Sequence, residues 1–323
     1  MSFTLEDLAG ATALVGRWVR PTPQYAWPLL GQAVGAEVWV KHENHTPTGA
    51  FKVRGGLVHL DRLRARRPPL TGIVSATRGN HGQSLAFAGR AHGVPVTIVV
   101  PHGNSPDKNE AMRGFGAELI EHGHDFQAAR EHCVVVARER GLHVVPAFHP
   151  DLVLGVATYA RELFGAVAEL DAVYVPVGMG SGICGLIRVR DLLGLRTEIV
   201  GVVSERAPAT ALSFAAGEVV STEKADTFVD GVACRVPDET AVATINAGAA
   251  RIVQVSEDTA AQAVRLLFAT THNVAEPAGA LALAGVLAEG PLVRGRRIGV
   301  VQSGGNVDAG MLAEILAGAT PAA

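Results

Sequence analysis

The chain is poor in cysteine, in net charge and in long apolar runs, and each shortage excludes a class of protein. Its three cysteines, Cys133, Cys184 and Cys234, lie far apart without a Cys-x-x-Cys pair. This spacing excludes a disulfide framework and a cysteine zinc site, and it suits a reducing compartment. No uncharged apolar run approaches the roughly 20 residues of a membrane-spanning helix, and residues 1–11 are acidic where a signal peptide is basic. We therefore expect a cytoplasmic protein without a membrane partner.

Charge and histidine content narrow the partners further. The net charge is −3, so we expect no nucleic acid partner. The 12 histidines include two close pairs, His42 with His45 and His122 with His124. Neither pair has a His-Glu-x-x-His frame or a nearby cysteine, so we expect no metal site. At 323 residues and 48% hydrophobic, the chain is long enough for a large core in two domains.

Strand and helix patterns alternate along the chain and predict an α/β fold. Short β-type runs and helical stretches alternate from residue 71 to 145, which predicts a small parallel unit. A second series runs from about residue 153 to 306, and its continuous apolar strands predict sheets covered on both faces. We expect a large domain from residues 1–70 and 148–323, and a small α/β domain from residues 71–147.

A glycine-rich loop follows one of these strands and precedes a helix. Residues 178–182 read Gly-Met-Gly-Ser-Gly, and such a loop presents backbone amides and a helix N-terminus to a phosphate. Two cofactors are consistent with it. Residues 180–185 also satisfy Gly-x-Gly-x-x-Gly, with Glu205 20 residues beyond Gly185, as in a nicotinamide-dependent oxidoreductase. A pyridoxal phosphate site additionally requires a lysine and a group facing the pyridine nitrogen.

Three polar residues supply the groups that a pyridoxal phosphate site requires. Lys52 lies among small and apolar residues in Thr-Gly-Ala-Phe-Lys-Val-Arg-Gly-Gly, where desolvation lowers the pKa of an amine. Asn80 follows a strand at the start of a helix, in a turn that presents amides and the Thr77 hydroxyl to a carboxylate. Ser303 ends another strand. Each signal alone is weak, because most lysines are solvated, Asn and Thr cap ordinary helices, and serine is common in turns.

Together these motifs resemble the fold-type II pyridoxal phosphate (PLP) enzymes, tryptophan synthase β-like in fold, and within them the serine/threonine dehydratase family. The likeness runs from about residue 21 to 306 and includes Val274–Ala280 and Asp230–Ala233. It implies two three-layer domains with parallel sheets and the cofactor in the cleft between them. It implies that Lys52 forms the Schiff base and is the catalytic residue. The cofactor-binding residues that it implies are Phe51 against the ring, Lys52, Asn80 at the ring hydroxyl, Gly178, Met179, Gly180, Ser181 and Gly182 at the phosphate, and Ser303 at the pyridine nitrogen. The substrate-binding residues that it implies are Thr77, Arg78, Gly79, His81 and Gly231.

The resemblance implies a lyase that eliminates the β-hydroxyl of serine, threonine or a bulkier 3-hydroxy amino acid, as a phenylserine dehydratase does. The products are a 2-oxo acid and ammonia, and the resemblance implies a homodimer. Arg78 departs from the family, which carries a small residue there, often serine. The arginine removes a hydroxyl that related racemases use as a second acid or base, so it disfavours racemisation. A racemase and a nicotinamide-dependent oxidoreductase are the alternatives.

Overall fold

A computed structural model describes residues 2–67, 69–124 and 126–322, and its larger part is built on a six-stranded sheet. In spatial order the strands are β1 (Gln24–Ala26), β2 (Glu37–His42), β10 (Arg297–Gln302), β7 (Ala172–Pro176), β8 (Glu198–Ser204) and β9 (Arg251–Val255). All neighbours are parallel except β1 and β2. The carboxyl ends of the parallel strands therefore lie along one edge, where open α/β sheets bind ligands.

Helices cover both faces of this sheet, as the apolar strands predict. Alternate residues of β7 point to opposite sides, so Val173 and Val175 join one apolar core and Tyr174 joins another. The first core includes residues of α1 (Leu5–Val15), α7 (Pro150–Ala166) and α8 (Ser181–Leu192). The second includes residues of α2 (Pro28–Val34), α11 (Glu257–Thr271), α12 (Pro277–Glu289) and α13 (Ala309–Leu316). The prediction of a three-layer arrangement is confirmed.

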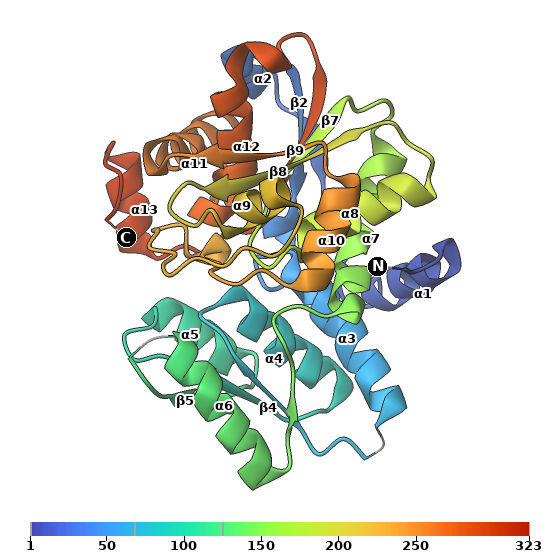
Figure 1. Cartoon of the computed structure of the whole chain (residues 1–323), viewed down its shortest axis with the longest axis vertical. Helices are drawn as coiled ribbons and strands as arrows, with labels where there is room; N and C mark the ends of the chain where they lie inside the picture. The colour runs from blue at the N-terminus through green and yellow to red at the C-terminus, as the bar shows by residue number, and fades with distance from the viewer. Residues whose placement is uncertain (1, 68, 125, 323) are drawn as a thin grey trace.

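A smaller, wholly parallel sheet forms the other part of the molecule. Its order is β5 (Glu118–Glu121), β4 (Val96–Val100), β3 (Ile73–Ala76) and β6 (His143–Val144). Helix α6 (Phe126–Arg140) packs on one face through Ala129, Cys133 and Val136. Helix α4 (Asn80–His92) and helix α5 (Pro106–Gly114) belong to the same part (Figure 1). The small parallel unit predicted between residues 71 and 145 is confirmed.

Two helices connect the two parts. Helix α3 (Lys52–Arg66) leads into the smaller sheet and α7 leads out of it, and the two helices pack against each other. The first apolar core continues through both helices into the smaller sheet. Because all four strands of that sheet lie between residues 73 and 144, we propose domain boundaries at residues 1–70 with 148–323 and at 71–147.

A buried ion cluster fixes the beginning of α3. The Arg54 guanidinium donates from Nε to Glu43 at 2.7 Å and from Nη1 to Glu162 at 2.6 Å. Lys41 donates to Glu162 at 2.6 Å. The side chains of Lys41, Glu43 and Arg54 are fully buried, and 13% of Glu162 is exposed. Such a cluster is costly to assemble and more costly to leave incomplete.

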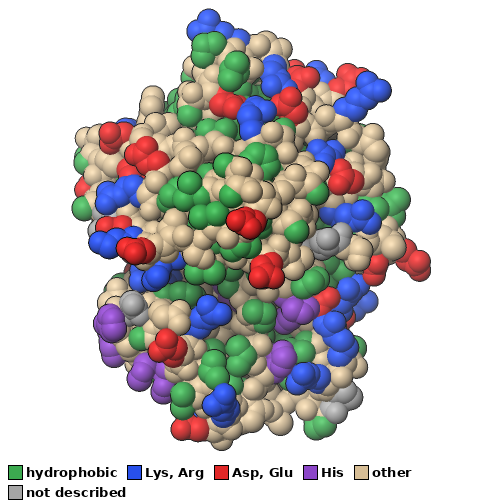
Figure 2. All heavy atoms as spheres, viewed as in Figure 1, with side chains coloured by type: hydrophobic (Ala, Val, Ile, Leu, Met, Phe, Trp, Pro, Cys, Tyr) green, Lys and Arg blue, Asp and Glu red, His purple; other side chains and the backbone are tan. Residues whose placement is uncertain are grey.

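The larger part contains five further described elements. They are α9 (Ala209–Ala216), α10 (Glu239–Gly248) and the 3-10 turns η1 (Glu43–His45), η2 (Asp230–Val232) and η3 (Gly290–Val293). No helix within the described residues is long and apolar enough to cross a membrane. Basic and acidic side chains are interspersed over the face in Figure 2.

Candidate functional site

Lys52 lies where the chain crosses the carboxyl end of β10. Ala50 forms an antiparallel bridge with Gly304, and the Phe51 N–H donates to the Ser303 carbonyl at 3.0 Å. The Ser84 hydroxyl of α4 donates to the Lys52 carbonyl at 2.6 Å. The backbone at Phe51 and Lys52 is therefore held by hydrogen bonds to both parts of the molecule. The same contacts bring two of the predicted site residues, Lys52 and Ser303, together.

The surroundings of Lys52 favour a neutral amine. Burial lowers the pKa of Lys52, and the nearby Glu276 carboxylate opposes this shift only in part. Burial also raises the pKa of Glu276 to about 7 and lowers the pKa of His81 to about 3. A positive charge on Lys52 also lowers the pKa of His81, so these two predicted residues lie near enough to affect each other's charge. A lysine with a lowered pKa can act as a nucleophile or a base near neutral pH.

Asn80 begins α4 and contacts two residues that the sequence analysis did not assign. Its Nδ2 donates to Glu276 Oε1 at 2.6 Å, and its Oδ1 accepts from Asn306 Nδ2 at 2.8 Å. Asn306 also donates to the Thr48 carbonyl at 2.8 Å. The Glu276 N–H donates to the Gly304 carbonyl, in the turn after β10, at 3.2 Å. The sequence signal that could have identified Glu276 and Asn306 as site residues is the resemblance of the segments around them to the family.

The glycine loop forms the turn between β7 and α8. Gly180 has a left-handed backbone with φ of 93°, and α8 begins at Ser181. A Cβ on Gly178 would lie 2.8 Å from the Gly231 carbonyl, so the loop passes close to η2. The Gly182 carbonyl accepts from the Tyr159 hydroxyl at 3.2 Å. The Tyr159 ring meets the Phe51 ring edge to face at 6.1 Å, which connects the loop to the lysine segment.

The predicted substrate loop follows β3. Thr77 is buried, and its hydroxyl accepts from the Gly79 N–H at 3.2 Å. A Cβ on Gly79 would lie 3.0 Å from the side chain of Lys108. Lys108 of α5 donates to Asp230 Oδ2 of η2 at 2.6 Å, and this pair links the two parts beside the loop. Burial opposes the charge of Lys108, but Asp230 and Glu276 outweigh it and raise its pKa. Lys108 lies in none of the sequence motifs that predicted the site.

Two predicted residues stand apart from the others. Among the described residues, Arg78 makes no side-chain hydrogen bond or ion pair, and it is exposed. Met179 packs against the larger core, and its sulfur lies 3.5 Å from Cys234 Sγ. The Met179 side chain therefore serves packing, and only its backbone is available to a ligand in the loop.

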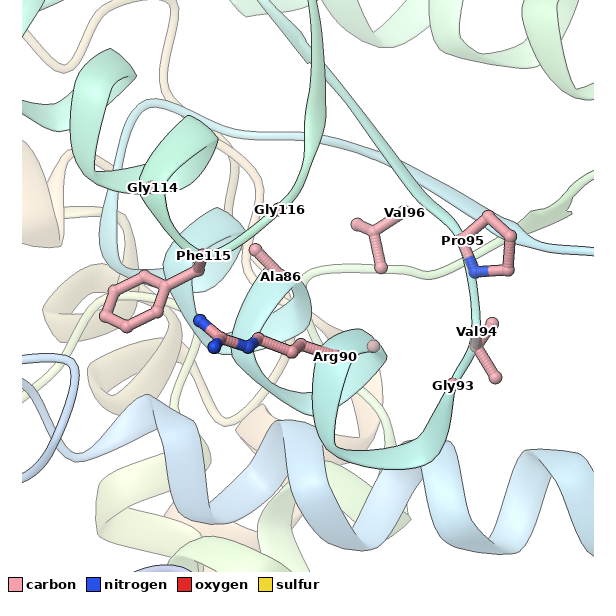
Figure 3. A pocket seen from close by; sticks show the side chains of 10 residues that line it. Ala86, Arg90, Gly93, Val94, Pro95, Val96, Gly114, Phe115 and Gly116 are labelled. Atoms are coloured by element: carbon pink, nitrogen blue, oxygen red, sulfur yellow. The ribbon is translucent and has the colours of Figure 1, made fainter.

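A surface hollow of about 390 Å³ lies elsewhere, on the small-sheet part (Figure 3). It is bounded by α4, by the turn before β4 and by residues 114–116. Among the described residues that line it, Arg90 is the charged one. None of the predicted site residues borders this hollow, and we assign it no chemistry.

The residues around Lys52 fit pyridoxal phosphate. The loop has no room for a side chain at Gly178, and it presents the N-terminus of the 12-residue helix α8, as a phosphate requires. The Ser303 hydroxyl is buried and makes one long contact, 3.4 Å to the Ala278 carbonyl, so it can still pair with a ring nitrogen. The Lys52 amine, the Ser303 hydroxyl and the glycine loop can therefore bind the aldehyde, the ring nitrogen and the phosphate of this cofactor.

Comparisons with known proteins agree with this chemistry. A family model described as pyridoxal-phosphate dependent enzyme matches residues 15–304. The L-threonine ammonia-lyase of Thermotoga maritima is 31% identical over 97% of this chain and 78% of its own. The L-threo-3-hydroxyaspartate ammonia-lyase of Saccharomyces cerevisiae is 30% identical over 98% of this chain and 97% of its own. The structure of processed threonine deaminase isoform 2 from Solanum lycopersicum superposes with a TM-score of 0.90 at 28% identity, covering 98% of this chain and 93% of that one.

Proposed function

From the premise that this chain belongs to the family of pyridoxal-phosphate-dependent enzymes, we propose that it removes the β-hydroxyl of a 3-hydroxy amino acid and releases a 2-oxo acid and ammonia. The observation that carries the proposal is the junction of Lys52 with Ser303 across the Phe51 N–H bond. The ammonia-lyase relatives that match nearly the whole chain support it. The family match over residues 15–304 supports pyridoxal phosphate, and not the nicotinamide alternative, as the cofactor.

When bound, pyridoxal phosphate is an electron sink for the electrons released at the substrate Cα. Lys52 Nζ would hold the cofactor and then take the Cα proton, a role that its lowered pKa supports. Residues 178–182 would bind the phosphate through backbone amides. Ser303 would offer the pyridine nitrogen a neutral hydroxyl, which favours loss of a β-substituent over transamination.

The remaining residues would orient the ring and the substrate. Asn80 would pair with the ring hydroxyl while keeping its contact with Glu276. The Thr77 hydroxyl, which the Gly79 N–H orients, and the amides of the α4 N-terminus would bind the substrate carboxylate. Phe51 would lie against the ring, and Gly231 and His81 would border the substrate.

The test compares wild type, Lys52→Ala and Lys224→Ala, in which an exposed lysine is the matched control. We expect the visible absorption band of a lysine-bound cofactor, and 2-oxo acid release from serine, threonine, 3-phenylserine or 3-hydroxyaspartate, in wild type and Lys224→Ala. Lys52→Ala should lose both. Retained turnover in Lys52→Ala, or no 2-oxo acid from any member of the panel, would contradict the proposal.

Arg78 is proposed to select the substrate side chain. It is an exposed cation beside the carboxylate-binding turn and has no described partner, so it can pair with an acidic side chain. The hydroxyaspartate-cleaving relative supports this role. We expect Arg78→Ser to lower kcat/KM for 3-hydroxyaspartate about tenfold, the effect of one lost charged hydrogen bond, with less change for serine. An equal loss for both substrates would contradict it.

We propose a cytoplasmic homodimer as the working state. The three buried free cysteines support a reducing compartment. Sedimentation of the purified enzyme with its cofactor measures the number of chains.

A further inference from the structure

Two histidines and an aspartate meet where α3 packs on α7, outside the site described above. His59 lies in the middle of α3, and His149 and Asp151 lie at the beginning of α7. One nitrogen from each ring and one carboxylate oxygen all lie within 4.8 Å of one another. The three residues come from the two helices that connect the larger and the smaller part.

His59 is a buried polar side chain without a partner. It is 1% exposed, and neither of its ring nitrogens has a hydrogen-bond partner among the described residues. Its Nδ1 points toward Asp151 Oδ2 at 3.9 Å, which is too long for a hydrogen bond. Buried ring nitrogens are normally paired, so this side chain points to a missing partner between the two residues.

The charge states of the group suit a cation. A histidine ring is mostly neutral at pH 7, and the buried His59 ring has no hydrogen-bond partner among the described residues that would stabilise a charge. His149 Nδ1 accepts the Asp151 N–H at 3.1 Å, so this nitrogen is unprotonated, and an ion bound there would replace the backbone N–H at its lone pair. Two neutral imidazoles and one carboxylate are the ligands of divalent zinc-like ions.

The distances are close to those of a coordination shell. Ligands bound at about 2.0–2.1 Å in tetrahedral geometry lie roughly 3.4 Å apart. His149 Nδ1 lies 3.5 Å from Asp151 Oδ2, and His59 Nδ1 is 3.9 Å from the same oxygen. The rings lie edge to face with centroids 4.7 Å apart. All three ligand atoms lie within 4.8 Å of one another, so the side chains must move closer together to form the shell. His149, which is 33% exposed, gives the ion a path from solvent.

Two arginines also pair with Asp151 and would have to yield. Arg62 donates to it at 3.1 Å, and Arg66 forms a second, short contact. Both side chains extend into solvent, with 39% and 53% of their surface exposed. The Asp151 side chain itself is buried, so binding an ion requires both guanidiniums to swing away from its carboxylate into solvent.

We propose that His59, His149 and Asp151 bind one divalent transition-metal ion of the zinc class, with water completing the shell, and that this ion fastens α3 to α7. The histidine pairs noted in the sequence, His42–His45 and His122–His124, are not these ligands. The histidines visible in Figure 2 lie on the lower half of the molecule, which contains the small sheet. The bound ion fixes the helix that begins with Lys52, and it does not enter the reaction.

The experiment uses the enzyme with its cofactor, stripped of metals by chelation. Zn²⁺ uptake is measured by competition with a zinc-sensitive dye in wild type, His59→Leu, Asp151→Asn and the control His45→Gln, which removes a histidine of another pair. Thermal unfolding is followed with and without Zn²⁺. Zinc-soaked crystals of wild type are examined at the zinc absorption edge.

We expect wild type and His45→Gln to bind one Zn²⁺ per chain, and binding to fall at least about 100-fold in His59→Leu and Asp151→Asn. At 100 times the dissociation constant, Zn²⁺ should raise the wild-type Tm by about 4 °C. The anomalous peak should lie between the three side chains, a readout that does not depend on the variants folding. No uptake by wild type, equal uptake by His59→Leu, or a peak elsewhere would overturn the proposal.

Discussion

Replacing Arg54 by leucine is expected to destabilise the protein far more than an ordinary ion-pair loss. The guanidinium is fully buried and contacts Glu43, Glu162 and the Thr158 hydroxyl, the last at 3.1 Å. In wild type the cluster holds two cations and two carboxylates. Arg54→Leu leaves two buried carboxylates with Lys41 alone.

The magnitude follows from this imbalance. Removing one partner of a buried ion cluster costs about 3–5 kcal/mol, because a charge is left without compensation. For a chain of this length the entropy of unfolding is roughly 0.7 kcal/mol per kelvin, so the Tm should fall by about 4–7 °C. The remaining cation, Lys41 Nζ, lies 2.6 Å from Glu162 and 4.0 Å from Glu43, so it cannot pair well with both carboxylates.

The assay is thermal and urea unfolding of the enzyme with its cofactor, with Arg113→Leu as the matched control. Arg113 pairs with Glu110 at 2.7 Å, but both side chains are exposed, so its loss should cost under about 1 kcal/mol. Equal changes in the two variants, or a loss below about 1 kcal/mol for Arg54→Leu, would refute the argument that burial determines the cost.

Arg54→Leu should also change how the stability of the protein depends on pH under acidic conditions. Burial raises the pKa of Glu162, but Arg54 and Lys41 outweigh it and hold the pKa below 4.5. Its contribution to stability is therefore present above pH 4.5 and is lost as the pH falls through the lower folded-state value. We expect the slope of Tm against pH below 4.5 to be smaller in Arg54→Leu than in wild type.

Three further predictions concern the site itself. Gly178→Ala should weaken pyridoxal phosphate binding at least about tenfold in an absorbance titration, because its Cβ would lie 2.8 Å from the Gly231 carbonyl and displace the loop; unchanged affinity would contradict this. Burial raises the pKa of Glu276 from 4.5 to about 7, so the unfolded chain releases this proton first and stability falls as the pH rises through that range. Glu276→Gln should remove this fall in Tm measurements, and an unaltered profile would count against it. Lys108→Met should lower kcat/KM about tenfold in steady-state assays, since it leaves Asp230 without the cation 2.6 Å away; wild-type kinetics would exclude a role for this pair.

The local sequence pattern was sufficient to predict the helices and strands and the loops that follow the strands. The run Ala-Val-Tyr-Val-Pro predicted β7, and the structure places the strand at Ala172–Pro176 with the glycine loop behind it. The second series of patterns was expected to begin near residue 153, but its first helix, α7, begins at Pro150, because the His149 ring caps it. That cap depends on side-chain geometry, which hydrophobic periodicity does not report.

Contacts between distant segments could not be predicted in the same way. Asn80 and Glu276 are 196 residues apart in the chain, and Lys108 and Asp230 are 122 apart. Nothing local to Lys108 distinguishes it from a solvated lysine, since its importance comes from its ion pair with Asp230 of η2. The meeting of His59 with Asp151 likewise depends on how α3 crosses α7.

The two hydrogen bonds around Lys52 have a mechanical consequence. One bond ties the Phe51 N–H to Ser303 at the end of the larger sheet, and the other ties the Lys52 carbonyl to Ser84 of α4. A rotation of one part of the molecule against the other must lengthen one of these bonds or carry the lysine with it. Any such rotation is therefore coupled to the position of the Lys52 backbone, from which the amine extends.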